Sequence, residues 1–167
     1  MVGYYVAAEK IYQAINGIQL PLTQALYPFV AKHEDIKTYK KWVSVALLCN
    51  VLICTFVFIF AKQFITIFYG SDMTEAYKIL RIFCFITLIT FPSILIGYPL
   101  LGALGHTKIA NNSVITGSII HIIGLFILFL TNKMNIYSIA LMVLITESIV
   151  FGIRGYFVLK YKLLKGY

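Results

Sequence analysis

Charged residues are scarce in this chain of 167 residues. They make up 12% of it, against about 25% in ordinary soluble domains, while 60% of the residues are hydrophobic. The few charges are also unbalanced, because fourteen Lys or Arg residues against six Asp or Glu residues give a net charge of +8. This composition argues against a soluble globular domain, and the position of the basic residues must indicate what they contact.

Motifs for covalent chemistry are missing as well. There is no HExxH, GxSxG, GxGxxG or Walker loop, and the three cysteines and three histidines show no metal-ligand spacing. The basic residues separate hydrophobic runs instead of gathering on one face with aromatic residues between them, which argues against nucleic-acid binding. We therefore expect no enzyme, no catalytic residue, no cofactor and no metal site.

Long hydrophobic runs, by contrast, are abundant. Four stretches without charge cover residues 11–31, 42–61, 82–105 and 109–132, and a fifth, 134–153, carries only Glu147. Each is long enough for a bilayer-spanning helix, which needs about 20 apolar residues. The sequence predicts an all-α integral membrane protein, one membrane domain over 1–167, with five transmembrane helices. We expect these spans at 5–30, 42–61, 79–104, 109–131 and 136–158.

The connections between these spans differ in their content of basic residues. Nine Lys or Arg residues follow the first, third and fifth spans, Arg154 included, whereas four lie in the other connections and Lys10 lies inside a helix. The positive-inside rule therefore predicts a cytoplasmic C-terminus and, with five spans, an N-terminus outside. Pro92 and Pro99 lie within the third span, where a missing backbone donor permits a bend.

The first span carries a polar stripe along its whole length. At 100° per residue, a set of polar side chains falls within about 60° of Glu9, and Lys10 lies at the edge of this sector. The set is Tyr5, Tyr12, Gln13, Asn16, Thr23, Gln24 and Tyr27. Such a stripe cannot face lipid, because unsatisfied polar groups are costly there. It either hydrogen-bonds to neighbouring helices or lines a hydrated cavity, and we favour the cavity.

Glu147 and His121 form a second group of polar residues within spans. Helical rise places both near the bilayer centre, on the fifth and fourth spans. A carboxylate at that depth must be protonated, paired or in contact with cavity water. Two interpretations remain: a hydrogen bond between the two that fixes a helical hairpin, which we favour, or a site that couples transport to protons or cations.

Several stretches of this sequence resemble a known family. GYYVAAEKIYQA at 3–14, with Pro21 and ALYPF at 25–29, resembles the eighth helix of bacterial polysaccharide flippases in the multidrug/oligosaccharidyl-lipid/polysaccharide exporter superfamily. LGALGHTKIANN at 101–112 and the stretch 135–147, which ends in ITE, resemble the family pattern between the tenth and twelfth helices. The resemblance implies that the five spans correspond to helices 8 to 12 of a twelve-helix, two-lobe exporter.

The resemblance also implies a function. Such flippases move undecaprenyl-pyrophosphate-linked oligosaccharide repeat units across the bacterial inner membrane, for O-antigen or capsular polysaccharide synthesis, by alternating access between two lobes. The expected partners are the lipid-linked oligosaccharide, membrane lipids and, as a further candidate, the polysaccharide polymerase machinery. The first lobe and the seventh helix have no counterpart in this sequence, so we expect transport only when that lobe is supplied in cis or in trans.

Within this family picture the polar stripe would line the substrate path. Lys10 would attract the pyrophosphate as a point charge, with Glu9 tuning it. The other path candidates, which would offer hydrogen bonds or stacking surfaces to sugars, are Tyr5, Tyr12, Gln13, Asn16 and Gln24. Glu9 and Lys10 can equally be read as an interfacial pair, with the Lys10 ammonium extending to water.

Two other functions remain open at this point. The chain would be a membrane remnant or an assembly partner without transport of its own if no complementary lobe exists. A cation-coupled multidrug exporter from a sister branch of the same superfamily is a less favoured alternative. Drug sensitivity would distinguish that alternative, because deletion would change it instead of surface polysaccharide.

Overall fold

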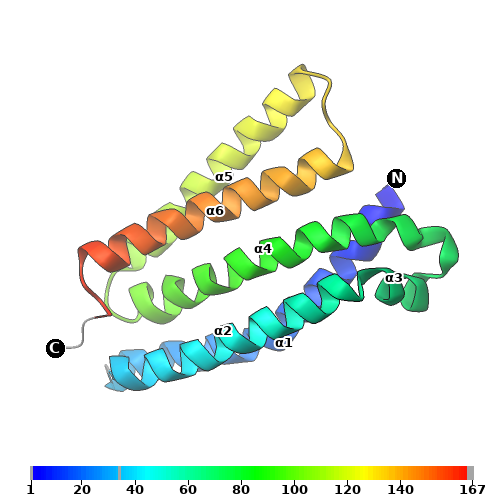
Figure 1. Ribbon diagram of the computed structural model, residues 1–167. Helices are drawn as coiled ribbons and strands as arrows, with labels where there is room; N and C mark the ends of the chain where they lie inside the picture. The colour runs from blue at the N-terminus through cyan, green and yellow to red at the C-terminus, as the bar shows by residue number, and fades with distance from the viewer. Residues whose placement is uncertain (1, 34, 165–167) are drawn as a thin grey trace.

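Helices account for almost all of the described part of the chain. The computed structural model describes residues 2–33 and 35–164, and no strand occurs in these ranges, which confirms the all-helical prediction (Figure 1). The α-helices are α1 (Val2–His33), α2 (Ile36–Ile59), α3 (Ala61–Tyr69), α4 (Tyr77–Ile96), α5 (Thr107–Leu130) and α6 (Ile136–Lys160). A 3-10 helix, η1 (Ser71–Ala76), precedes α4, and a π-helix, η2 (Gly97–Gly102), follows it.

Four helical segments are long and apolar enough to cross a membrane, so the chain is a helical membrane protein. They are Ile36–Ile59, Ser71–Gly102, Thr107–Leu130 and Ile136–Lys160. The prediction of five spans is therefore supported for four of them among the described residues. Helix α1 has 32 residues and is long enough, but it is not among the apolar segments. The polar stripe of α1 lowers its mean hydropathy. A membrane helix in the interior of a bundle, beside a cavity, would have the same low hydropathy.

Helix α4 lies at the centre of the bundle. It packs against α1 and α2 on one side and against α6 on the other, and α5 reaches the bundle mainly through α6 and η2 (Figure 1). In the most apolar stretch of the segment Ser71–Gly102, which contains α4, 56% of the residues are buried, against 11% in the corresponding stretch of α5. The surface of α5 is therefore the part of the bundle that is most available to lipid.

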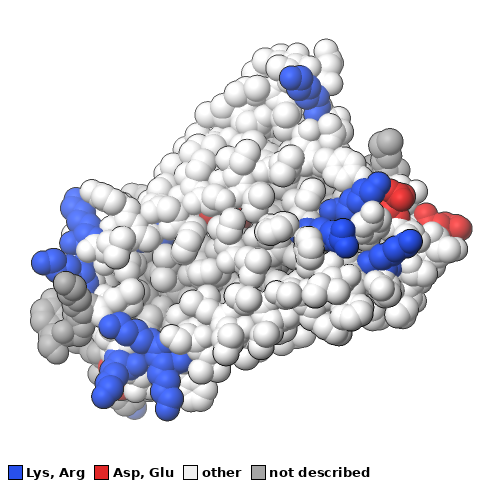
Figure 2. Space-filling model, viewed as in Figure 1, with Lys and Arg blue, Asp and Glu red and all other residues white. Residues whose placement is uncertain are grey.

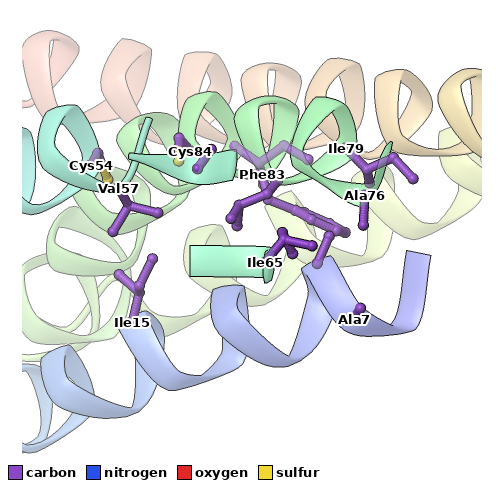
Figure 3. Close-up of a cluster of buried hydrophobic side chains, with 13 residues drawn as sticks. Ala7, Ile15, Cys54, Val57, Ile65, Ala76, Ile79, Phe83 and Cys84 are labelled. Atoms are coloured by element: carbon purple, nitrogen blue, oxygen red, sulfur yellow. The ribbon is translucent and has the colours of Figure 1, made fainter. Parts of the chain in front are cut away.

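Two apolar clusters hold the helices together. Figure 3 shows the first, in which Ala7 and Ile15 of α1 face side chains of α2, α3 and α4, with Phe83 of α4 among them. The second lies at the other end of α1, around Val30, Tyr39 and Leu95. In that cluster the Tyr39 hydroxyl donates to the backbone oxygen of Leu95 at 2.9 Å, so its polar tip is satisfied.

The expected bend of the third span takes the form of a change of helix type. The α-helix continues through Pro92, and the π-helix begins five residues later and contains Pro99. Proline removes a backbone donor, and neighbouring groups in membrane helices compensate through local adjustments of this kind. Short π-helical segments are frequent at functional sites, which directs attention to the residues that contact η2.

Candidate anion-binding site

Arg154 is a buried cation inside the helical bundle. It lies on α6, six residues before the helix ends at Lys160, and its side chain is only 6% exposed. Sequence analysis counted Arg154 with the C-terminal basic residues, so the structure moves one charge from the surface to the interior. A buried charge is stable only when a counter-charge, hydrogen bonds or water compensates its desolvation.

Hydrogen bonds from Arg154 join three helices. Its Nε donates to Ser113 Oγ on α5 at 2.9 Å. Its Nη1 donates to the backbone oxygen of Ser93 on α4 at 2.8 Å and to Ser93 Oγ at 3.2 Å. Both serines are fully buried, and their small side chains leave space for the guanidinium. The contacts hold one side of the guanidinium in a fixed orientation.

Gly97 at the start of η2 is required by this arrangement. A Cβ atom placed there would lie 2.8 Å from Nη1 and 3.0 Å from Cζ of Arg154. Such separations are shorter than real side chains adopt, so any larger residue would displace the guanidinium. The helix change after α4 therefore lies directly against the buried cation.

No carboxylate of the described part of the chain forms an ion pair with Arg154, although Glu147 on the same helix face lines the second cavity with it and attracts it electrostatically. The ion pair found there joins Lys78 and Glu75, on the opposite end of the bundle. The Nη2 amine of Arg154 makes no hydrogen bond with a described residue and is not sealed from the adjacent space. Two N–H donors and a full positive charge are thus available to a ligand, and the ligand chemistry they favour is anionic.

Two cavities meet at Arg154. The first has a volume of about 380 Å³ and lies between α1, the α4–η2 junction and α6. Its wall consists of Thr23, Gln24, Tyr27, Ile94, Tyr98, Pro99 and Arg154. Three of these residues, Thr23, Gln24 and Tyr27, belong to the polar stripe predicted on the first span. The C-terminal half of that stripe therefore faces a cavity.

The second cavity has a volume of about 530 Å³ and lies between α4, α5 and α6. Glu147, His121, Thr90 and Arg154 are among its wall residues. The predicted hydrogen bond between His121 and Glu147 is not formed, because His121 Nδ1 lies 3.0 Å from Thr146 Oγ1 instead. Helix geometry explains the difference, since the position before Glu147 faces α5 more directly. A coupling role for Glu147 stays a prediction.

The N-terminal half of the predicted stripe packs differently. Tyr5 and Tyr12 contact Phe83 of α4, with ring centroids 5.4 Å and 4.9 Å away. Their rings are therefore engaged in helix packing. The remaining candidates Glu9, Lys10, Gln13 and Asn16 line neither cavity; Lys10 and Gln13 are exposed, and Glu9 and Asn16 are half-buried. Their predicted contacts with substrate stay predictions.

Sequence reasoning missed two features of the interior. The first is Arg154, although it lies seven residues after Glu147 and so shares a helix face with an intramembrane carboxylate. The second is a buried hydrogen bond of 2.7 Å from Gln19 Nε2 on α1 to Asn50 Oδ1 on α2. Asn50 was visible as a polar residue within an otherwise apolar run.

Comparison with known proteins does not add to this geometry. No protein family, no characterised protein and no solved structure matches the chain. The conclusions about its function therefore rest on its residues and their arrangement.

Proposed function

We propose that this chain forms part of a flippase for undecaprenyl-pyrophosphate-linked oligosaccharides in the bacterial inner membrane, corresponding to helices 8 to 12 of the C-terminal lobe. The observation that carries the proposal is the buried Arg154, which forms no ion pair with a carboxylate of the described chain and which lines a cavity. Arg154 replaces Lys10 as the first candidate for binding the phosphate. Lys10 is exposed, whereas Arg154 is held in a fixed orientation.

The chemistry of Arg154 supports this assignment. A guanidinium presents planar, paired donors that match the oxygens of a phosphate, and it stays protonated even when buried. The bonds to Ser93 and Ser113 orient it before a ligand arrives, which lowers the entropic cost of binding. An anionic lipid headgroup would in turn supply a counter-charge in direct contact with Arg154, where Glu147 acts only at longer range.

The position of the cavity supports loading from the cytoplasmic leaflet. Tyr27 and Arg154 lie six residues before the ends of α1 and α6, so the cavity lies about 9 Å from those ends. Figure 2 shows basic side chains at the two ends of the molecule and an almost uncharged band between them. Without Arg154 the predicted cytoplasmic side still has eight basic residues against four, so the proposed orientation is unchanged.

In this proposal helix α1 also crosses the membrane, which brings the number of spans to five. Its apolar residues pack into both clusters of the bundle, while Thr23, Gln24 and Tyr27 face the cavity. A polar wall of this kind suits one half of an alternating-access pathway. The other half would come from a first lobe, in cis or in trans.

A test of this function compares cells of the native host that carry Arg154→Gln, Arg154→Lys or Lys160→Gln. We expect Arg154→Gln to abolish surface polysaccharide and to leave lipid-linked oligosaccharide on the cytoplasmic leaflet, with partial export for Arg154→Lys. Lys160→Gln is the matched control, because it removes an exposed charge from the same helix. Membrane levels of each variant are measured by immunoblot.

Deletion of the chain separates the alternatives. Normal surface polysaccharide after deletion would contradict the proposal and favour an assembly partner or remnant without transport. Increased sensitivity to cationic drugs with normal polysaccharide would instead favour a multidrug exporter.

A further inference from the structure

Two tyrosines from different elements converge on the first cavity. Tyr27 of α1 and Tyr98 of η2 both line it, together with Arg154. They meet over Gly102, where an added Cβ atom would lie 3.0 Å from Tyr98 Cδ1 and 3.5 Å from Tyr27 Cε2. The missing side chain at Gly102 therefore permits both rings to approach the same point.

The rings of this pair are available to a ligand. Tyr98 is 48% exposed and Tyr27 is 41% exposed. Neither ring has an aromatic partner among the ring contacts of the described residues, in contrast to Tyr5 and Tyr12, which pack on Phe83. The Tyr98 hydroxyl is hydrogen-bonded to Asn111 Oδ1 of α5, which holds that ring at the cavity wall.

This combination of groups fits a sugar. An aromatic face binds the C–H face of a pyranose ring, and amide and hydroxyl groups beside it bind the sugar hydroxyls. The exposed side chain of Gln24 supplies an amide in the same cavity. Arg154 supplies the cation for a phosphate attached to that sugar.

The first cavity is open to the molecular surface and has a volume of about 380 Å³, near the lower end of small-molecule sites, which span roughly 300–1,000 Å³. It has room for one sugar with its phosphate, and the rest of an oligosaccharide would extend outward from it. We propose that this cavity recognises the sugar next to the lipid phosphate, with Tyr27 and Tyr98 as the platform for that sugar. The inference rests on the proposed function, since it assumes that Arg154 binds the lipid phosphate.

Binding to the full chain in lipid nanodiscs tests this inference. The probes are dodecyl phosphate, taken as its methyl ester so that both probes are monoanions, and the same lipid with one N-acetylglucosamine in place of the methyl group. We expect the wild-type protein to bind the glycosylated probe about tenfold more tightly than dodecyl phosphate, because the free energy of a good aromatic contact corresponds to a factor of about that size. Tyr27→Leu and Tyr98→Leu should each reduce that ratio toward one and leave the affinity for dodecyl phosphate unchanged.

Three further variants complete the design. Tyr156→Leu, an exposed tyrosine of α6 outside both cavities, should keep the wild-type ratio. Tyr98→Phe retains the ring but loses the bond to Asn111, and it should keep most of the preference. Arg154→Gln should weaken both probes equally. Far-ultraviolet circular dichroism verifies that each variant keeps its helical content.

The outcomes distinguish the two proposals. Equal binding of both probes by the wild-type protein, or an unchanged ratio in both leucine variants, would overturn the sugar platform and leave phosphate binding intact. Failure of the wild-type protein to bind dodecyl phosphate, or binding that Arg154→Gln does not weaken, would overturn the proposed phosphate site and the platform with it.

Discussion

Arg154 Nη1 donates a hydrogen bond of 2.8 Å to the backbone oxygen of Ser93, and this bond ties α6 to α4 within one turn of the π-helix. The same oxygen accepts from the backbone N–H of Gly97, the first residue of η2. The guanidinium thus contacts the backbone at the point where the helix type changes. Movement of α6 relative to α4 must break or carry along this contact, so the candidate anion site and the helix change are mechanically linked.

Gly97→Ala tests how closely the guanidinium packs on α4. The added methyl group would lie 2.8 Å from Nη1, so Arg154 must shift and its bonds to Ser93 must weaken. We expect the variant to lose about 1–3 kcal/mol of stability, the usual cost of overpacking. A thiol-reactive dye in detergent measures this during heating in a Cys49→Ser background. Cys49 is exposed and would react in the folded state, whereas Cys54 and Cys84 are buried and react only after unfolding.

Gly152→Ala is the matched control for that measurement. Its Cβ atom would meet nothing within 4 Å, and it lies on α6 close to Arg154 in sequence. We expect unchanged or slightly higher stability, since alanine is favoured over glycine in a helix. Equal stability of the two variants would show that Arg154 does not occupy the space beside Gly97.

The helices could be predicted from the sequence, because the charges that bound the hydrophobic runs are few and clustered. The position of Arg154 could not. An arginine six residues from a helix end can extend to the surface or turn inward, and the choice depends on Ser93, Ser113 and Gly97, which lie far away in sequence. Tertiary contacts of this kind leave no periodic signal in α6 itself.

The polar stripe of α1 was predicted from the sequence, but only some of the contacts of its side chains were. The angular position of the stripe around the helix axis was sufficient to place Thr23, Gln24 and Tyr27 at a cavity. It gave no information on Tyr5 and Tyr12, because an aromatic ring with a hydroxyl can either pack on Phe83 or face water. Gln19 lies about 80° from Glu9 on the helical wheel, outside the sector considered, and its partner Asn50 is on another helix.

The Gln19–Asn50 bond should contribute measurably to the packing of α1 on α2. Asn50→Leu leaves Gln19 buried without a hydrogen bond, and Gln19→Leu leaves Asn50 with only the weak bond from Cys54 Sγ at 3.6 Å. The double variant removes both polar groups. We expect a coupling energy of about 0.6–1.7 kcal/mol from the double-mutant cycle, the range found for interhelical bonds in membranes. Additive effects of the two single substitutions would mean that the bond does not stabilise the fold.

The N-terminus of α2 should respond to acid through Asp35. Its carboxylate accepts a hydrogen bond from the backbone N–H of Thr38 at 3.0 Å, and interactions with the side chain and backbone of Thr38 hold the pKa of Asp35 below its ordinary value of 3.8. A carboxyl group whose pKa is lower in the folded state stabilises the fold above the unfolded pKa, and this contribution disappears as the pH falls through the folded pKa. We therefore expect the cap to act fully at pH 7 and to weaken below about pH 4.

Asp35→Asn separates this effect from general acid denaturation. Asparagine caps a helix about as well as aspartate but does not titrate in this range. Unfolding midpoints of both proteins, measured by far-ultraviolet circular dichroism between pH 7 and pH 3, should therefore fall more steeply for the wild-type protein below pH 4. Parallel curves would contradict a capping role for the charged carboxylate.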